Sequence, residues 1–273
     1  MVNQEEISDE ELIALMQAIN NRYGLDFTNY ERSSLKRGIV RLMMKNKMET
    51  IIELWSRVLK DEHFFKDSID DLLVNLTELF RNPDVWIKLR DHVIPTLGND
   101  RLSVWHAGCS TGEEAYTMSF LLETINRHYQ ANLLATDLSG TALRKARKGE
   151  YNLQVMQSYL KPFLEFFPGK KLSDYFDYTD KSAVIKSQYL RNITFQKHNL
   201  VADAMHGAFD IIFCRNVMIY FDDLLKEKVL KLLYDNLKPN GYFVIGYYDI
   251  MPSFGKELFK TYDIKTKIYV KKS

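Results

Sequence analysis

The sequence predicts an α/β fold in which a doubly wound, mostly parallel sheet follows a small all-helical domain. Apolar residues recur at helical spacing through the first part of the chain, whereas from Leu102 onward short apolar runs alternate with helical stretches. The first run ends in a loop of small residues and the second ends at Asp137, an arrangement typical of sheets that bind a nucleoside. We therefore expect a helical domain over residues 1–85 and a sheet domain over 86–273, with a small antiparallel β insertion at about 174–198.

The helical domain begins with a capping-box signal, because Ser8 is followed three residues later by Glu11. The expected helices cover residues 8–24, about 29–47, 48–60 and 62–75. On the second helix, basic residues repeat mostly four apart opposite an apolar face: Arg32, Lys36, Arg37, Arg41 and Lys45. We expect this face to dock an acidic protein surface; the alternative is an ordinary solvated face.

The sheet domain opens with two strand–helix units. Leu102–Ala107 is a predicted strand that leads to a helix from Glu113 to about Arg127, and Leu133–Thr136 is the next strand, followed by a helix that Ser139 caps and that ends at Lys148. An irregular aromatic-rich stretch then precedes the insertion. The remaining expected segments are insertion strands over 174–178, 183–190 and 193–198, the last placed to merge with the main sheet, a strand over 209–214, a helix over 222–237 closed by residues 239–241, a strand over 242–247 and a hairpin over 259–270.

Composition excludes several classes of function. Lysine and arginine (37) balance aspartate and glutamate (36), so no overall field favours nucleic acid. The two cysteines and six histidines have neither disulfide nor metal-ligand spacing, so we expect no metal. The acidic start is unlike a secretory signal, and no stretch has membrane-spanning length, which together predict a cytoplasmic protein without membrane insertion.

The predicted cofactor site combines the loop Gly108–Gly112 with Asp137. Small residues between a strand and a helix let the backbone approach a ligand and direct amides toward it. An acidic residue at the end of the next strand can accept both hydroxyls of a ribose. The two features predict a nucleoside cofactor, but they leave a dinucleotide and S-adenosylmethionine as alternatives.

Four blocks of the sequence, in order, resemble the CheR methyltransferases: residues 75–81, 105–114, 135–137 and 213–221. The resemblance implies a class I S-adenosylmethionine-dependent methyltransferase with a Rossmann-like sheet. It also implies methyl transfer to glutamate side chains of methyl-accepting chemotaxis receptors, which leaves S-adenosyl-L-homocysteine. The residues that it assigns to the cofactor are Asn75, Thr77, Arg81, Ala107, Glu113, Asp137, Asn199, Leu200, Arg215 and Asn216.

Two residues are candidates for a catalytic role. Arg81 has a planar fork of donors that could hold a carboxylate, of either the cofactor or the substrate. Tyr220, just past the predicted strand at 209–214, could border the transferred methyl group; a core tyrosine is the alternative. The rival functions are a nucleic-acid or small-molecule methyltransferase of the same fold, and a non-catalytic cofactor-binding regulator.

The chain departs from the family pattern at two places that bear on substrate. Residues 246–249, Gly-Tyr-Tyr-Asp, replace a glycine, small polar residues and a glutamate, which affects the expected substrate preference. The insertion turn at 178–182 is short and lacks the glycines that let a receptor's C-terminal peptide add to the sheet edge in some relatives. We therefore expect no C-terminal receptor pentapeptide tether.

Overall fold

The computed structural model describes residues 7–72, 77–98 and 100–272. The chain forms two compact units, Met1–Asn75 with Ile219–Lys226, and Leu76–Met218 with Glu227–Ser273. The described residues 77–85 belong to the second of these units. In the part of the chain that is described, no helix has both the length and the apolar character to cross a membrane.

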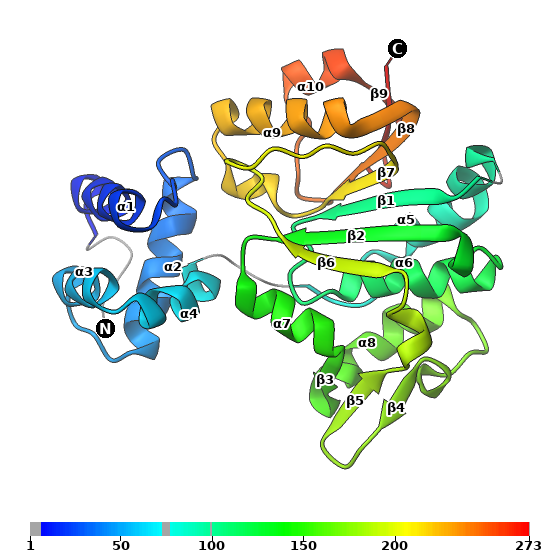
Figure 1. Cartoon of the computed structure of the whole chain (residues 1–273), viewed down its shortest axis with the longest axis horizontal. Coiled ribbons are helices and arrows are strands. Elements are labelled where there is room, and N and C mark those ends of the chain that lie inside the picture. The colour runs from blue at the N-terminus through cyan, green and yellow to red at the C-terminus, as the bar shows by residue number, and fades with distance from the viewer. Residues whose placement is uncertain (1–6, 73–76, 99, 273) are drawn as a thin grey trace. The chain divides into compact units, whose positions relative to one another are not determined.

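The first unit consists of four helices and a short segment from far along the chain (Figure 1). The helices are α1 (Asp9–Tyr23), α2 (Arg32–Lys45), α3 (Ile51–Lys60) and α4 (Glu62–Leu72). The capping box of Ser8 and Glu11 forms as predicted at the start of α1. The segment from 219 is held by backbone bonds, from the Glu31 amide to the Tyr220 carbonyl (2.8 Å) and from the Asp222 amide to the Asn29 carbonyl (2.9 Å).

The second unit is built on a seven-stranded sheet in the order β6-β2-β1-β7-β8-β10-β9. The strands are β1 (Leu102–Ala107), β2 (Ala131–Asp137), β6 (Ile193–Lys197), β7 (Phe209–Cys214), β8 (Leu237–Ile245), β9 (Phe259–Asp263) and β10 (Ile268–Lys271). The five strands from β6 to β8 pair in parallel, and β10 lies antiparallel between β8 and β9. This confirms the doubly wound sheet, and β6, the last strand of the predicted insertion, does merge with it.

Helices connect and cover these strands (Figure 1). They are α5 (Pro83–Lys88), α6 (Glu113–Thr124), α7 (Gly140–Lys148), α8 (Leu153–Phe166), α9 (Asp223–Asn236) and α10 (Ser253–Leu258). Short helical turns lie at Leu89–Val93, Ile94–Leu97, His128–Gln130, Leu172–Asp174, Ser187–Tyr189 and Met218–Tyr220. As predicted, the Ser139 hydroxyl caps α7 by accepting a hydrogen bond from the Ala142 amide (2.9 Å).

A small antiparallel sheet, in the order β3-β5-β4, stands apart from the main one. Its strands are β3 (Glu150–Asn152), β4 (Phe176–Tyr178) and β5 (Ser182–Ile185). The turn between β4 and β5 is closed by the Thr179 amide, which donates to the Ser182 carbonyl (2.8 Å). A plain tight hairpin was the expected conformation of this turn.

Several segments differ from the prediction, among them the strand expected over 183–190, which ends at Ile185 and is followed by a helical turn. The stretch expected to be irregular contains β3 and the helix α8, whose Phe163 and Phe166 pack against Phe80. Residues 239–241 do not close α9, because β8 begins at Leu237 and runs through them with a register shift against β7. The same strand ends at Ile245, so Tyr247 lies in a turn, and the helix α10 that follows was not predicted.

Candidate active site

The loop after β1 passes close to its neighbours because it contains glycine at two positive-φ positions. Gly108 has φ 84° and Gly112 has φ 94°, and a Cβ on Gly108 would lie 2.4 Å from a methyl carbon of Val217. The amides of Gly108 and Cys109 both donate to the Thr136 carbonyl on β2, at 2.8 Å each. The Gly112 amide likewise donates a hydrogen bond, to the Cys109 carbonyl (3.0 Å).

The hydrogen bonds of its backbone amides distinguish this loop from a phosphate-binding loop. Phosphate-binding loops direct unpaired backbone amides at an anion, whereas the amides of Gly108, Cys109, Ser110 and Gly112 all donate to protein acceptors here. Our expectation that the loop presents amides to a ligand is therefore wrong for these four. The small residues serve close approach, which favours S-adenosylmethionine over a dinucleotide with its pyrophosphate.

Asp137, the last residue of β2, holds this loop to the start of α7. One carboxylate oxygen accepts the Ser110 amide and the other accepts the Ser139 amide, both at 2.8 Å. The side chain is nearly buried, with 8% of its residue surface exposed. Each carboxylate oxygen has two lone pairs, so a carboxylate at the end of β2 can accept hydroxyl groups as well as backbone amides.

Glu113, the first residue of α6, is a buried carboxylate that accepts hydrogen bonds from the hydroxyls of Thr111 and Tyr159. Thr111 Oγ1 lies 2.7 and 2.9 Å from its two oxygens, and the Tyr159 hydroxyl donates at 3.1 Å. It is 3% exposed, and burial raises its pKa although these hydroxyls oppose the rise. A cationic ligand group would therefore stabilise its ionised form.

Acidic groups gather around the loop. Their effect is seen at the thiol of Cys109. Burial raises the pKa of this thiol most, and the negative charges of Asp137, Glu114 and Glu113 raise it further. A negative field of this kind suits a cofactor with a sulfonium and an ammonium group. The buried carboxylates Glu113 and Asp137 beside this loop therefore fit a cofactor that carries positive charge, such as S-adenosylmethionine.

Arg215, after β7, ties together parts of the chain that are far apart in sequence. Its guanidinium donates to Glu114 Oε2 (3.3 Å), to the Arg81 carbonyl (3.0 Å) and to Asn82 Oδ1 (2.7 Å). Glu114 also pairs with His106 Nδ1 (2.9 Å). Burial acts against the charge of Glu114, but His106 and Arg215 outweigh it and lower its pKa. No local pattern indicated a role for Glu114 or His106, because that role depends on Arg215, which is distant in the chain.

Arg81 and Asn216 lie together at this edge of the sheet. Arg81 Nη1 is 3.4 Å from Asn216 Oδ1, and its Nε is 3.2 Å from Glu78. Asn216 has a positive φ of 59°, and its amide donates to Asp249 Oδ2 (2.7 Å). Asp249 was not predicted as a site residue, and it fixes the backbone at Asn216.

The other predicted residues are placed as follows. Ala107 ends β1 and is buried, whereas Thr77 is half-buried. The Asn199 side chain accepts the Val201 amide (3.0 Å) and so shapes the turn after β6, in which Leu200 is buried. Asn75 lies outside the described residues. Tyr220 belongs to the segment that packs with the helical unit.

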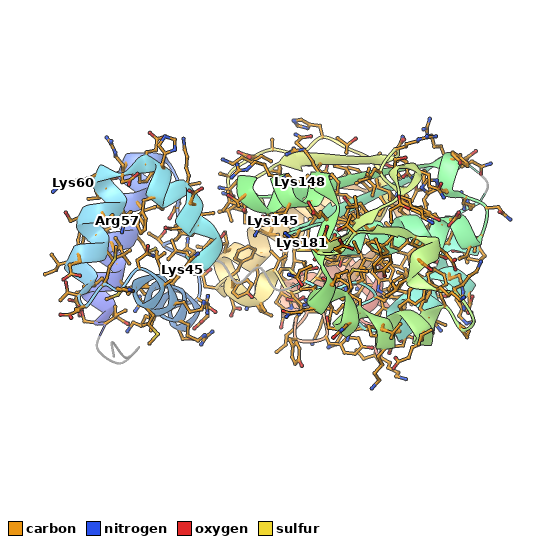
Figure 2. The ribbon with its side chains drawn as sticks, turned by 90° about the horizontal axis from the view of Figure 1, so that it is seen from below. Lys45, Arg57, Lys60, Lys145, Lys148 and Lys181 are labelled. Carbon is orange, nitrogen blue, oxygen red and sulfur yellow. The ribbon has the colours of Figure 1, made fainter. Side chains whose placement is uncertain are left out.

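Two of the basic side chains of α2 pair with an acidic residue of α1. Asp9 of α1 pairs with Arg32 Nη1 (2.6 Å) and with Lys36 Nζ (2.7 Å). Arg37, Arg41 and Lys45 are exposed and recur four residues apart, so they share one face. Figure 2 labels Lys45 on this unit, with Arg57 and Lys60 of α3.

Comparison with known proteins identifies the family. The model of the CheR methyltransferase SAM-binding domain matches residues 75–268, and that of the CheR methyltransferase all-alpha domain matches residues 10–73. The methyltransferase Cher3 of Pseudomonas putida is 32% identical over 246 residues, which cover 90% of each chain. The chemotaxis protein methyltransferase of Listeria innocua is 31% identical over 243 residues, covering 87% of this chain and 89% of the relative. Chemotaxis protein methyltransferase 1 of Pseudomonas aeruginosa is 31% identical over 219 residues, covering 76% and 77%.

These matches confirm the resemblance seen in the four sequence blocks, and they extend over both units. They also agree with the doubly wound sheet and with the acidic loop at its edge. The chain therefore belongs to the CheR methyltransferase family, whose activity is S-adenosylmethionine-dependent methylation in chemotaxis.

Proposed function

We propose that this protein methylates glutamate side chains of methyl-accepting chemotaxis receptors, in the cytoplasm and without a metal. The observation that carries the proposal is the pair of buried carboxylates, Glu113 and Asp137, at the edge of the sheet where Arg81 and Asn216 also lie. The family match supplies the class of acceptor. When bound, S-adenosylmethionine supplies an electrophilic methyl group.

The residues act mainly by positioning. A glutamate substrate is already ionised at neutral pH, so transfer needs no strong general base. Glu113 would bind the cofactor's amino group and Asp137 its ribose hydroxyls, while Asn199 and Leu200 border the adenine. Arg81 would hold a carboxylate through its fork of donors.

Arg215 has a different part in this proposal from the one implied by family resemblance. Its two Nη atoms bond Glu114, Asn82 and the Arg81 carbonyl. We therefore assign its side chain the task of positioning the segment that carries Arg81, while Asn216 Oδ1 lies 3.4 Å from the Arg81 guanidinium. For Tyr220 we keep the role proposed from the sequence, which is to border the transferred methyl group.

Substrate docking would use the basic residues of α2, whose positive charge complements clustered receptor glutamates: Arg32, Lys36, Arg37, Arg41 and Lys45. The tight turn after β4 supports recognition without a C-terminal pentapeptide tether. A substrate panel tests the function: cytoplasmic receptor fragment, small dicarboxylic acids and DNA, each with labelled cofactor. The expected result is labelling of the receptor fragment alone, at a rate that Arg81→Ala reduces. Labelling of small acids or DNA instead would refute the proposal, and cofactor binding with no labelling of any substrate would indicate the regulator.

A further inference from the structure

The loop that follows β8 is held rigidly at the edge of the sheet. The Asp249 amide donates to the Gly246 carbonyl (3.0 Å), which closes a four-residue turn. The Asp249 carboxylate oxygen Oδ2 accepts both the Gly246 amide and the Asn216 amide, each at 2.7 Å. Tyr247 adds a second anchor, because its hydroxyl bonds Asp84.

Two large apolar side chains project from this anchored loop into solvent. Tyr248 is 82% exposed and Ile250 is 78% exposed, although the adjacent Asp249 and Met251 are buried. The only charged residue between 246 and 251 is the buried Asp249, so the loop offers solvent an apolar surface without an exposed charge. Side chains on a fixed backbone lose less entropy when a partner covers them.

The loop adjoins the residues assigned to the reaction. A Cβ on Gly246 would lie 2.8 Å from backbone and side-chain atoms of Asn216, whose side chain is in turn within 3.4 Å of Arg81. Because β7 and β8 are parallel neighbours, the segments that follow them emerge at the same edge. Tyr129, which is equally exposed, precedes β2 and so lies at the opposite edge.

We propose that Tyr248 and Ile250 are a docking contact for the substrate protein and bind apolar side chains next to the acceptor glutamate. The inference rests on the proposed function, since it takes the acceptor to be a glutamate on a helix. Residues three and four positions from that glutamate share its helix face, so they reach the enzyme surface around the reacting group. An exposed tyrosine and isoleucine on a loop without an exposed charge favour apolar partners there.

A double variant, Tyr248→Ser with Ile250→Ser, tests the contact in the full-length protein. With a purified cytoplasmic receptor fragment we expect KM to rise about 10- to 100-fold, the range that corresponds to burying two such side chains in part. The kcat value and the affinity for S-adenosyl-L-homocysteine should stay within about twofold of the wild-type values, a change of less than about 0.5 kcal/mol. Tyr129→Ser is the matched control, and it should leave KM unchanged.

Substitutions in the receptor fragment provide a second test of the same contact. Serine in place of the apolar residues three and four positions from the methylated glutamate should raise KM for the wild-type enzyme but add little to the KM of the double variant, because both changes remove one contact. Fully additive effects would overturn the inference, as would a wild-type KM for the double variant or a loss of cofactor affinity in it. Failure of the proposed function is distinct, since the wild-type enzyme would then not label the receptor fragment.

Discussion

Replacing Glu113 with glutamine tests two effects of its buried negative charge: binding of the cofactor and destabilisation of the ligand-free protein. The change keeps the shape of the side chain and an oxygen that can accept from Thr111 and Tyr159, but it removes the negative charge. If that charge binds the cofactor's ammonium group, a charge-assisted hydrogen bond worth about 1.5 to 3 kcal/mol is lost. The Kd for S-adenosylmethionine should then rise about 10- to 150-fold.

The same substitution should stabilise the ligand-free protein. Burial raises the pKa of Glu113 above its ordinary value of 4.5, so the native state holds the proton more tightly than the unfolded state. The stability contributed by this group therefore falls as pH rises from about 4.5 through the raised pKa, and it stays reduced above that pKa. At neutral pH the glutamine variant should unfold at a higher temperature than the wild type, because it has no charge to bury.

Calorimetric titration and thermal unfolding measure the two effects. In the wild type, cofactor affinity should rise with pH as Glu113 ionises, and this dependence should disappear in Glu113→Gln. Glu165→Gln, at an exposed position on α8, is the control and should change neither quantity. An unchanged Kd in the folded Glu113→Gln variant would remove this residue from the site, and a lower unfolding temperature would contradict the burial argument.

Four further predictions follow from the site and the helical unit. Asp137→Ala should weaken cofactor binding by about 2 to 4 kcal/mol and also lower the unfolding temperature, since two backbone amides lose their acceptor; calorimetry and melting curves that match the wild type would refute this. Arg81→Ala should reduce turnover at least about tenfold, and Arg81→Lys should restore it only partly, because the fork geometry is missing; normal kcat in both would make it a surface residue. Arg37→Glu with Arg41→Glu should raise KM for the receptor fragment at low salt and leave cofactor affinity unchanged; an unaltered KM would defeat the docking role. Removal of the last five residues of the receptor should change the methylation rate by less than about tenfold, whereas a larger drop would reveal a tether.

Local signals predicted most of the fold. The capping box at Ser8 and the cap at Ser139 were correct because short-range hydrogen bonds determine them. The strand 102–107 was correct because it is a short apolar run bounded by loop residues. The helix α8 was missed because it carries Pro162 in its interior and buries aromatic side chains that lack a strong polar alternation. Its stability comes from tertiary packing, as on Phe80, which no local pattern records.

The start of β8 was missed for a related reason. Pro239 to Gly241 is typical of a helix end, but in this chain these residues continue a strand whose register against β7 shifts there. Pairing with a distant strand determined the outcome.

A residue of the candidate site could be predicted where its position at the end of a strand is enough to suggest its role. Asp137 is such a case, and the structure adds the two amides that it accepts. The network of Arg215, Glu114 and His106 joins segments about a hundred residues apart, so only the folded chain reveals it. The same holds for Asp249, which looks like an ordinary turn residue in the sequence but fixes the backbone of Asn216.

Methyl transfer to a receptor fragment, followed by mild alkali, tests the central claim most directly. A glutamate methyl ester releases its label as methanol, whereas a methylated amine or nucleobase retains it. We predict that label from S-adenosylmethionine enters the fragment, that alkali releases it, and that replacing the acceptor glutamates with alanine abolishes it. Label that resists alkali, or that still enters the fragment without those glutamates, would contradict the account.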